Sequence, residues 1–278
     1  MRLGYNTNGF TSHRLDDALT VLGGLGYESV ALTLDHHALD PFRADVSHEV
    51  RQVRRRLEEL KLLPVIETGA RFILDPWRKH RPTLLEDEEP GRRRREDFLT
   101  RAIDLAAELG APAMSFWSGV GPDTAGPGTL DDRLIAALER LAEHASRRGV
   151  VLAFEPEPGM HVSTMDDFQR VHARLPHPAL RLTLDVGHAH LTEDEGAEAT
   201  VRRFAPLVAN VQLEGMLRPR HDHLLPWEGD MDLPAVMRAL ADVGYAGPAC
   251  FELSRHSHDA VEIARRAFAF AQDALGKR

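Results

Sequence analysis

Short apolar runs alternate with amphipathic segments along the whole chain. Runs such as Val151–Phe154 are typical of strands buried in a sheet, and segments such as Ser47–Leu60, with apolar residues three or four positions apart, are typical of helices. The pattern predicts eight strands, over Arg2–Asn6, Ser29–Leu34, Leu63–Ile66, Ala113–Trp117, Val150–Phe154, Leu180–Leu184, Leu207–Leu213 and Ala249–Leu253. It also predicts eight helices, over Leu15–Leu25, Ser47–Leu60, Arg95–Leu109, Asp131–Arg147, Thr164–Leu175, Ala197–Phe204, Leu233–Val243 and His258–Leu275.

Eight strand–helix units with no break in composition predict one domain over residues 1–278, folded as an α/β protein of the (β/α)8 TIM-barrel class. A doubly wound sheet is the structural alternative. The turn after the first strand, Asn6-Thr7-Asn8-Gly9, lacks the glycine pattern of a dinucleotide site, and the chain has no P-loop. The charged run from Glu86 to Arg95 is predicted to be a solvated loop that leads into the third helix.

The net charge and the cysteine content limit which binding partners and which kinds of metal site the protein can have. The formal net charge is −9, which argues against a nucleic-acid or membrane-surface partner, because phosphate groups demand a basic face. Cys250 is the single cysteine, so a disulfide framework and a cysteine metal site are excluded. No secretory segment and no apolar run near the ~20 residues of a membrane span are found, and a cytoplasmic location is therefore expected.

Acidic residues stand where several predicted strands end. Glu155 follows Val151–Phe154, Asp185 follows the sixth strand, and Glu252 lies at the end of the eighth. The carboxyl ends of barrel strands meet at one face, so these carboxylates are expected to converge and repel one another. A divalent cation would hold them together, and without sulfur the ligands do not choose among Mn²⁺, Mg²⁺, Co²⁺ and Zn²⁺.

With these residues the whole chain resembles the xylose-isomerase-like barrel superfamily of sugar isomerases, ketose 3-epimerases and endonuclease-IV-type repair enzymes. The resemblance rests on Glu155 in Phe-Glu-Pro, Asp185 with His188 in Asp-x-x-His, Gln212 in the seventh strand, and Glu252 in Phe-Glu-Leu. In the family these positions hold Glu, Asp, His and Glu around one divalent ion. The resemblance thus implies a site of Glu155, Asp185, Gln212 and Glu252 for one ion, with Mn²⁺ expected first. Gln212 stands where the family has histidine and is a weaker ligand.

The resemblance also implies an activity. Glu155 and Glu252 would remove and return a proton through an enediolate in a sugar or sugar-phosphate isomerase or epimerase. Further substrate contacts are implied at a set of polar residues after the strands, namely His188, Arg218, His221, His223 and Glu157. The implied substrate is a small polyhydroxylated molecule, and members of the superfamily are often homo-oligomers.

Other features come from the residues themselves and leave alternatives open. Trp117 is expected either to form an aromatic wall of the site or to pack in the core. Basic residues of the loop after the third strand indicate either an anionic substrate or a solvated lid; they are Arg71, Arg78, Lys79, His80 and Arg81. Simpler roles are also open: Glu155 and Glu252 paired with arginines, Asp185 capping a turn, His188 in the interior, and His221 and His223 at the surface.

Three other functions compete with the isomerase or epimerase. One is a lyase of the 3-dehydroshikimate dehydratase type, in which a base removes a proton and hydroxide leaves. Another is a binding protein whose metal site has decayed, because Gln212 replaces a histidine. The endonuclease-IV-type reading is disfavoured, since further zinc-binding histidines are missing at Glu67, Trp117 and Gln212 and the net charge is negative.

Overall fold

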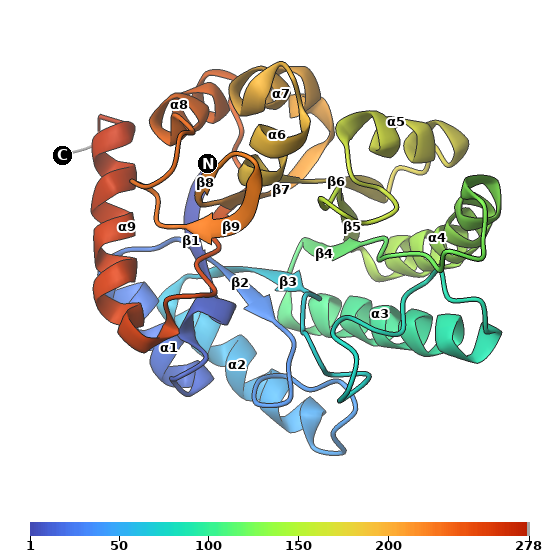
Figure 1. Cartoon of the computed structure of the whole chain (residues 1–278). Coiled ribbons are helices and arrows are strands. Elements are labelled where there is room, and N and C mark those ends of the chain that lie inside the picture. The colour runs from blue at the N-terminus through green and yellow to red at the C-terminus, as the bar shows by residue number, and fades with distance from the viewer. Residues whose placement is uncertain (277–278) are drawn as a thin grey trace.

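A closed barrel of parallel strands lies at the centre of the computed structural model, which describes residues 1–276, and helices surround it (Figure 1). The strands follow one another around the barrel in the order β1-β10-β7-β6-β5-β4-β3-β2. Their bounds are β1 Arg2–Asn6, β2 Ser29–Thr33, β3 Leu63–Glu67, β4 Ala113–Trp117, β5 Val151–Glu155, β6 Leu180–Asp185, β7 Val208–Leu213 and β10 Pro248–Phe251. The predicted TIM-barrel class is confirmed.

Helices cover the outside of the barrel because each buries one apolar stripe against the strands. They are α1 Leu15–Leu25, α2 Val46–Leu60, α3 Glu89–Leu109, α4 Pro127–Arg148, α5 Met165–Arg174, α6 Val186–Thr192, α7 Gly196–Phe204, α8 Leu233–Asp242 and α9 Ala260–Ala274. Short 3₁₀ helices lie at Thr7–Phe10, Ala205–Leu207 and Ser257–Asp259. No helix among residues 1–276 has the length and apolar character needed to cross a membrane.

The predicted start of the third helix was wrong. α3 begins at Glu89, and the second half of the supposed solvated loop forms its first two turns. Pro90 lies in the first turn, where its missing N–H costs nothing, and Arg93 pairs with Glu89 one turn away. Arg95, at the end of the charged run, is buried. Charge alone therefore did not distinguish an exposed helical face from a loop.

Two elements near the barrel opening escaped the sequence pattern. α6 follows β6 without a loop, and it begins where the Asp185 side chain accepts a hydrogen bond from the His188 backbone N–H. The second is an antiparallel hairpin between β7 and α8, made of β8 (Gly215–Leu217) and β9 (Arg220–Leu224). The hairpin packs beside α6 (orange and gold in Figure 1). Its strands are too short and polar to show an alternating apolar pattern.

Strand register places polar residues side by side at one end of the barrel. Asp185 on β6 is paired with Gln212 on β7, and Glu67 on β3 with Ser115 on β4. At the opposite, more apolar level, small buried side chains fill the barrel and form a cluster of Ala31, Val65, Ala113, Ala153 and Cys250. The interior of the barrel is thus apolar and packed toward the amino ends of the strands. Toward their carboxyl ends it is lined by polar side chains, which we call the polar cup, as expected for this architecture.

Candidate active site

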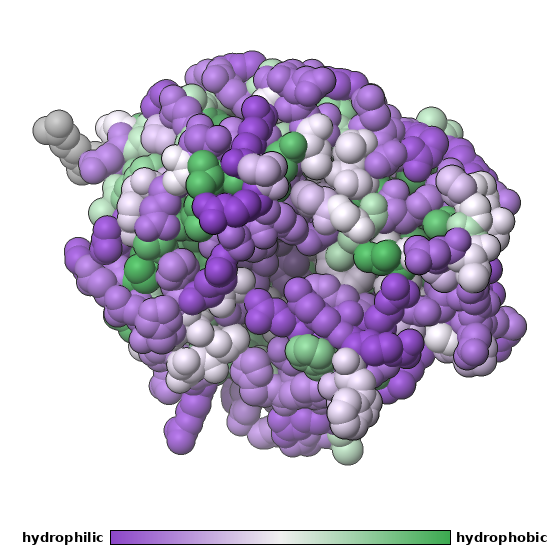
Figure 2. All heavy atoms as spheres, viewed as in Figure 1, coloured by the Kyte–Doolittle hydropathy of each residue, from purple (hydrophilic) through white to green (hydrophobic). Residues whose placement is uncertain are grey.

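The polar cup opens into a cavity of about 530 Å³. Figure 2 shows a hollow at the centre of this face, surrounded mainly by hydrophilic residues. Residues from the ends of six strands and from the loops above them line it: Asn8, Thr11, Thr33, Asp35, Glu67, Gly69, Ala70, Arg71, Lys79, His80, Trp117, Glu155, Glu157, Pro158, His188, Gln212, His221, His223, Glu252, Ser254 and Ser257. Most of the predicted site residues are therefore in one place.

Three carboxylates converge here: Glu155 and Glu252 line the cavity, and a carboxylate oxygen of the buried Asp185 lies within 4.8 Å of one of Glu252. Glu155 ends β5, Asp185 ends β6, and Glu252 directly follows β10. Glu252 Oε1 accepts a hydrogen bond from Asn8 Nδ2 at 2.8 Å, and Glu155 Oε2 lies 3.5 Å from Ser115 Oγ. None of the three carboxylates forms an ion pair with an arginine or lysine among residues 1–276.

The charge of this cluster is poorly compensated. Burial, followed by the neighbouring carboxylate of Glu157, raises the pKa of Glu155 well above its ordinary value. Burial also raises the pKa of Glu252. Asp185 differs: burial opposes its ionisation, but His188 and further hydrogen bonds outweigh burial and lower its pKa. The cluster holds one stable carboxylate and several that ionise reluctantly, and this electrostatic setting favours a bound cation.

Unpartnered oxygen atoms support a metal site here. Asp185 Oδ1 accepts the hydrogen bond that caps α6, and a capping role was one of the alternatives expected for this residue. The other oxygen, Oδ2, is buried without a hydrogen-bond partner. The buried Oε1 of Gln212 is likewise without a partner. Buried polar atoms normally have partners. Carboxylate and amide oxygens are the donors that hard divalent ions prefer, so these two unpartnered oxygens, with the neighbouring carboxylates of Glu155 and Glu252, fit a metal.

The side chain of Gln212 is hydrogen-bonded to Glu67, which was not predicted from the sequence as a site residue. Its Nε2 donates to Glu67 Oε1 at 3.0 Å, and Asn210 Nδ2 lies 3.4 Å from the same oxygen. Burial, with the charge of Glu252, raises the pKa of Glu67 well above its ordinary value. Glu67 ends β3, and the sequence indicated it only as a position that lacks a histidine. Asn8, the partner of Glu252, gave no signal beyond its place after the first strand.

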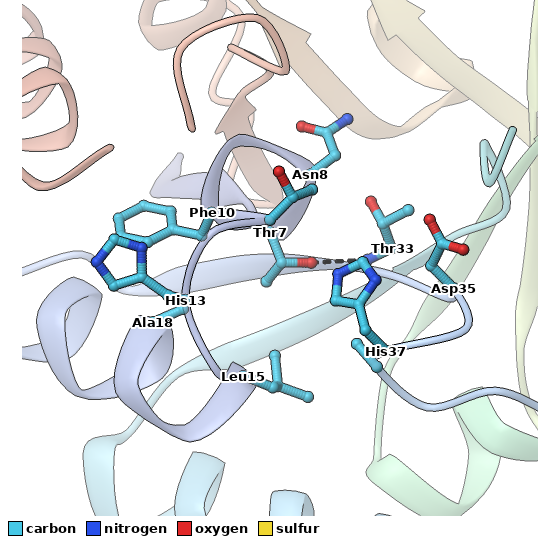
Figure 3. Close-up of a pocket in the computed structure, with 11 residues that line it drawn as sticks. Thr7, Asn8, Phe10, His13, Leu15, Ala18, Thr33, Asp35 and His37 are labelled. Atoms are coloured by element: carbon cyan, nitrogen blue, oxygen red, sulfur yellow. Dashed lines mark hydrogen bonds between the residues drawn. The ribbon is translucent and has the colours of Figure 1, made fainter. Parts of the chain in front are cut away.

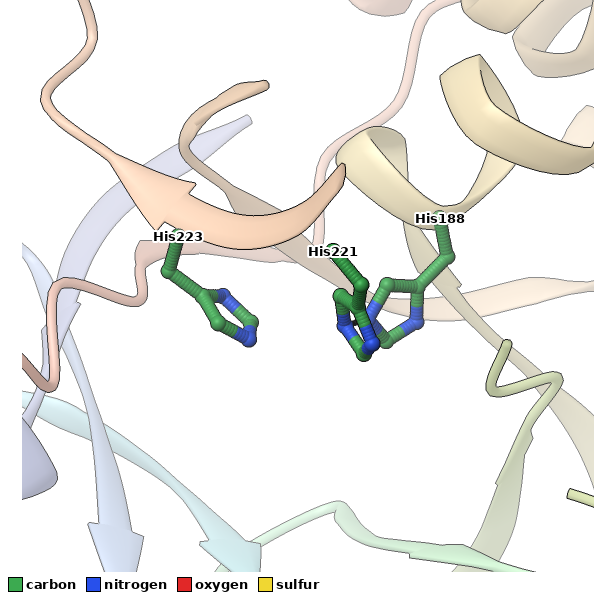
Figure 4. Close-up of side chains that lie close together, drawn as sticks. All are labelled: His188, His221 and His223. Carbon is green, nitrogen blue, oxygen red and sulfur yellow. Dashed lines mark hydrogen bonds between the residues drawn. The ribbon is translucent and has the colours of Figure 1, made fainter. Parts of the chain in front are cut away.

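Three histidines gather above the carboxylates, His188 from α6 and His221 and His223 from β9 (Figure 4). The Nε2 atoms of His188 and His221 are 2.8 Å apart. His188 Nδ1 lies 3.2 Å from the carbonyl oxygen of Pro156, which only accepts, so Nδ1 carries the proton. Burial lowers the pKa of His188 to about 4, so the ring is neutral and accepts from His221 Nε2–H.

His223 has a different environment. Its Nδ1 lies 3.9 Å from Glu214 Oε2, and Glu214 is fully buried. Burial disfavours the charged ring, but the carboxylates of Glu214, Glu252 and Asp185 outweigh burial and raise the pKa of His223 to about 10. In the absence of a metal, this imidazolium is the positive charge nearest the acidic floor.

Glu157 lies two residues beyond Glu155 and also lines the cavity. Its Oε1 is 3.9 Å from His221 Nε2. Burial raises its pKa to about 8, with the charges of Asp185 and Glu252 adding to the effect. A carboxyl group with a pKa near neutrality is suited to proton transfer.

The wall of the cavity on the side of the long β3–α3 loop is aromatic and basic. Trp117 is buried, and its ring contacts both the His80 ring, at 5.1 Å between centroids, and the Arg95 guanidinium, 4.7 Å from the ring centroid. Trp117 lines the cavity and is buried, so its position is compatible with the expected aromatic wall, whose contact with substrate stays a prediction. Arg71 and Lys79 also line this wall.

The basic loop divides into two groups. Arg78 pairs with Asp75, and Arg81 pairs with Glu86, so both serve the loop itself. Arg71 and Lys79 form no ion pair with the described residues and face the cavity. Only part of the loop's positive charge is therefore available to an anionic ligand.

Arg218 lies outside the cavity. Its Nε donates to the carbonyl oxygen of His190 at 2.6 Å, and its Nη2 lies 3.5 Å from that of Glu193. The guanidinium thus caps the C-terminal end of α6. Its predicted contact with substrate stays a prediction.

A smaller cavity of about 30 Å³ adjoins the main one (Figure 3). It shares Asn8, Thr11, Thr33 and Asp35 with the main cavity and reaches His37. This volume accommodates a group of about the size of a water molecule. It extends the site toward the β1–α1 and β2–α2 loops.

Groups of His, Asp and Glu side chains close enough to hold a metal ion occur three times in the described chain. They are His188–His221–His223, Glu155–Glu157–His188 and Asp185–His223–Glu252, each with ligand atoms within 4.8 Å of one another. The predicted ligands are thus joined by histidines from α6 and β9. The site has the donors of a metal centre, an acid–base carboxyl of raised pKa, and a cavity large enough for a sugar.

The closed parallel barrel, with carboxylate and histidine side chains gathered at the carboxyl ends of its strands, places the protein in the TIM-barrel class. The profile of the xylose isomerase-like TIM barrel family matches residues 20–274, and the chain belongs to this family. Fructoselysine 3-epimerase from Shigella flexneri is 26% identical over 173 residues, which are 61% of this chain and 62% of that protein. The matches span from 51% to 62% of the length of the curated relatives.

Solved structures share the fold over the full chain. The apo form of 3-keto-D-glucoside 4-epimerase from E. coli has a TM-score of 0.79 and 15% identity, covering 98% of this chain and 99% of that chain. The IOLI protein with a bound zinc atom has a TM-score of 0.76 and 15% identity, covering 100% and 99%. At these identities the likeness establishes the fold.

Proposed function

We propose that the protein is a divalent-metal-dependent epimerase or isomerase of a sugar or sugar phosphate. The observation that carries the proposal is the convergence of Glu155, Asp185 and Glu252 at the carboxyl ends of the strands, with no arginine or lysine among residues 1–276 paired to any of them. The family's relatives include a fructoselysine 3-epimerase and a 3-keto-glucoside 4-epimerase, which favour a sugar substrate. A cytoplasmic location and a homo-oligomeric state stay predictions.

The proposed metal site consists of Glu155, Asp185, Gln212 and Glu252. The unpartnered oxygens of Asp185 and Gln212 support it, and one structural neighbour is recorded with zinc. Oxygen-rich donors make Mn²⁺ the first expectation, with Mg²⁺, Co²⁺ and Zn²⁺ as alternatives. When bound, the ion would polarise a substrate carbonyl and acidify the adjacent C–H.

The protein's own groups would then move the proton. Glu155 on β5 and Glu252 after β10 are separated in the barrel by β6 and β7, so their carboxylates reach the cavity from different sides. One would take the proton from one face of the substrate carbon, giving an enediolate, and the other would return a proton to the opposite face. Glu157, with its raised pKa, would exchange protons with the substrate's oxygen atoms.

Neighbouring residues would position the substrate. His221 would offer a ring N–H once its bond to His188 is exchanged for one to a substrate oxygen, and His188 would then accept from a substrate hydroxyl. His223 would line the same side. Trp117 would give the sugar a flat apolar wall, and Arg71 with Lys79 would attract an anionic group such as phosphate.

Deuterium exchange tests this proposal. The protein, loaded with Mn²⁺, is incubated in D₂O with a panel of ketoses and ketose phosphates, and loss of a carbon-bound proton is followed by ¹H NMR. We expect exchange accompanied by a new epimer or aldose for at least one substrate, and no exchange with chelated protein. A dehydrated product would instead establish the lyase. Absence of any ion from the protein after incubation with each of the four metals would refute the proposal.

A further inference from the structure

We propose that His223, on the β9 hairpin, supplies the imidazole ligand of the metal site that strand β7 lacks. This inference rests on the single-metal site proposed above and adds a ligand to it. The barrel strand carries Gln212 at the position level with Asp185, so an imidazole has to come from elsewhere.

The geometry places His223 with two of the proposed ligands. Ligand atoms of Asp185, His223 and Glu252 all lie within 4.8 Å of one another. Two atoms that bind one ion at about 2.1 Å lie at most about 4.2 Å apart. Ligands at adjacent positions lie closer, about 3.0–3.4 Å apart, so binding would draw these atoms together by at most about 1.8 Å, which rotation of the three side chains covers.

A carboxylate stands behind His223, as is usual for metal-binding histidines. His223 Nδ1 faces Glu214 Oε2 at 3.9 Å, and both atoms are buried without hydrogen bonds to described residues. Glu214 is itself fixed, because its Oε1 accepts from the Gly187 backbone N–H at 2.8 Å. A metal-binding histidine generally donates its second ring N–H to a carboxylate, which orients the ring and makes it more basic. Here that arrangement leaves Nε2 of His223 for the ion.

The close packing around Glu214 shows that this support is built into the fold. A Cβ at Gly187 would lie 2.1 Å from Glu214 Oε1, so only glycine leaves room for the carboxylate next to the start of α6. Glu214 has no arginine or lysine partner among residues 1–276. Among residues 1–276, His223 is the basic side chain that faces it.

The neighbouring histidine of the hairpin gives a matched control. His221 Nε2 is already bonded to His188 Nε2, and it points toward Glu157 rather than the Asp185–Glu252 pair. The rings of His221 and His223 lie 5.4 Å apart between centroids, so both variants disturb the same hairpin. An effect specific to His223 therefore separates ligation from damage to the hairpin.

The test measures metal binding directly. Mn²⁺ affinity is measured by calorimetry, and imidazole nitrogen on bound Mn²⁺ is detected by electron spin-echo modulation, for the wild type and for His223→Gln, His221→Gln and the double variant Gln212→His/His223→Gln. We expect one ion with nitrogen modulation in the wild type, at least a tenfold loss of affinity and no modulation in His223→Gln, and less than a threefold change in His221→Gln. The double variant, which restores the family's arrangement, should recover both signals.

The outcomes separate the two proposals. A wild-type protein that binds no ion refutes the metal-dependent function itself. A wild-type ion without nitrogen modulation, or His223→Gln binding as tightly as the wild type, refutes only the role of His223. Because the modulation is measured on the wild type, the test does not depend on the folding of any variant.

Discussion

Gln212 donates its side-chain amide to Glu67 at 3.0 Å, and this bond fixes which way its carbonyl oxygen faces. The oxygen is buried and without a partner. Glu67 thereby acts as a positioning residue for a weak metal ligand that would otherwise rotate freely.

Removing the acceptor tests this role. Glu67→Leu should weaken Mn²⁺ binding by about tenfold, because residues that orient metal ligands have effects of that size. Glu67→Gln keeps an acceptor oxygen and should stay within about threefold of the wild type. Calorimetric titration measures both. Equal affinities in the wild type and Glu67→Leu would show that Gln212 needs no orientation.

Substitution of the proposed acid–base pair should separate the two faces of the substrate. Glu155→Gln and Glu252→Gln should each reduce turnover by about 10²–10⁴-fold at saturating metal, the usual contribution of a general acid or base. Each variant keeps the base for one face of the substrate carbon. It should therefore still exchange deuterium slowly into the epimer whose C–H lies on that face, and the two variants should differ in which epimer exchanges. NMR of the isolated epimers in D₂O makes the measurement. Exchange lost equally from both epimers in both variants would contradict the two-base assignment.

Stability of the metal-free protein should fall as the pH rises from 6.5 to 8. Burial raises the pKa of Glu157 to about 8 in the folded protein, whereas the ordinary value of 4.5 applies to the unfolded chain. Between these two pH values the folded state keeps a proton on Glu157 that the unfolded state has lost. This contribution is fully present below pH 4.5 and disappears as the pH passes about 8. His223, whose pKa is raised to about 10 by nearby carboxylates against the opposing effect of burial, acts in the same direction above its ordinary value of 6.5.

Urea unfolding of chelated protein at several pH values measures this slope. Glu157→Gln should make it shallower, and added Mn²⁺ should stabilise the protein more at pH 8 than at pH 6.5. A stability that rises over this interval would show that the buried carboxyl groups are ionised already at pH 6.5.

Arg95 should stabilise the β3–α3 loop, which carries Lys79 and His80 on the wall of the cavity. Its buried guanidinium donates to the carbonyl oxygens of Pro82 and His80, both at 2.8 Å. Arg95→Met leaves these acceptors unpaired and should cost about 1–3 kcal/mol in the free energy of unfolding. Arg94→Met, at the exposed neighbouring position, should change it by less than about 0.5 kcal/mol. Denaturant titration of both compares them, and equal losses would argue against the buried role of Arg95.

The barrel was predictable because its strands are short apolar runs and its helices have regular amphipathic spacing. The carboxylates Glu155, Asp185 and Glu252 were predictable as site residues because the ends of parallel strands converge. Glu67 and Asn8 were not predicted as site residues, because their importance lies in hydrogen bonds to distant residues, Glu67 with Gln212 and Asn210 of β7 and Asn8 with Glu252 after β10. Such pairings over long sequence distances leave no local pattern.

The β8–β9 hairpin was missed for a related reason. Polar residues such as Arg220 and Asp222 conceal its strands, and its direction is set by packing against α6 rather than by alternation. The hydrogen bonds of Arg218 with backbone carbonyl oxygens are likewise visible only in three dimensions.

The hairpin gives the site two parts with different evolutionary freedom. Glu155, Asp185 and Glu252 belong to a closed ring of strands, where a change of spacing disturbs every neighbour. His221 and His223 belong to the β8–β9 hairpin, which forms a two-stranded sheet separate from this ring. The proposed substrate contacts of His221 and His223 can therefore change through this one hairpin without a change in the ring, and grafting the hairpin onto another barrel of the family would test whether it carries substrate selectivity.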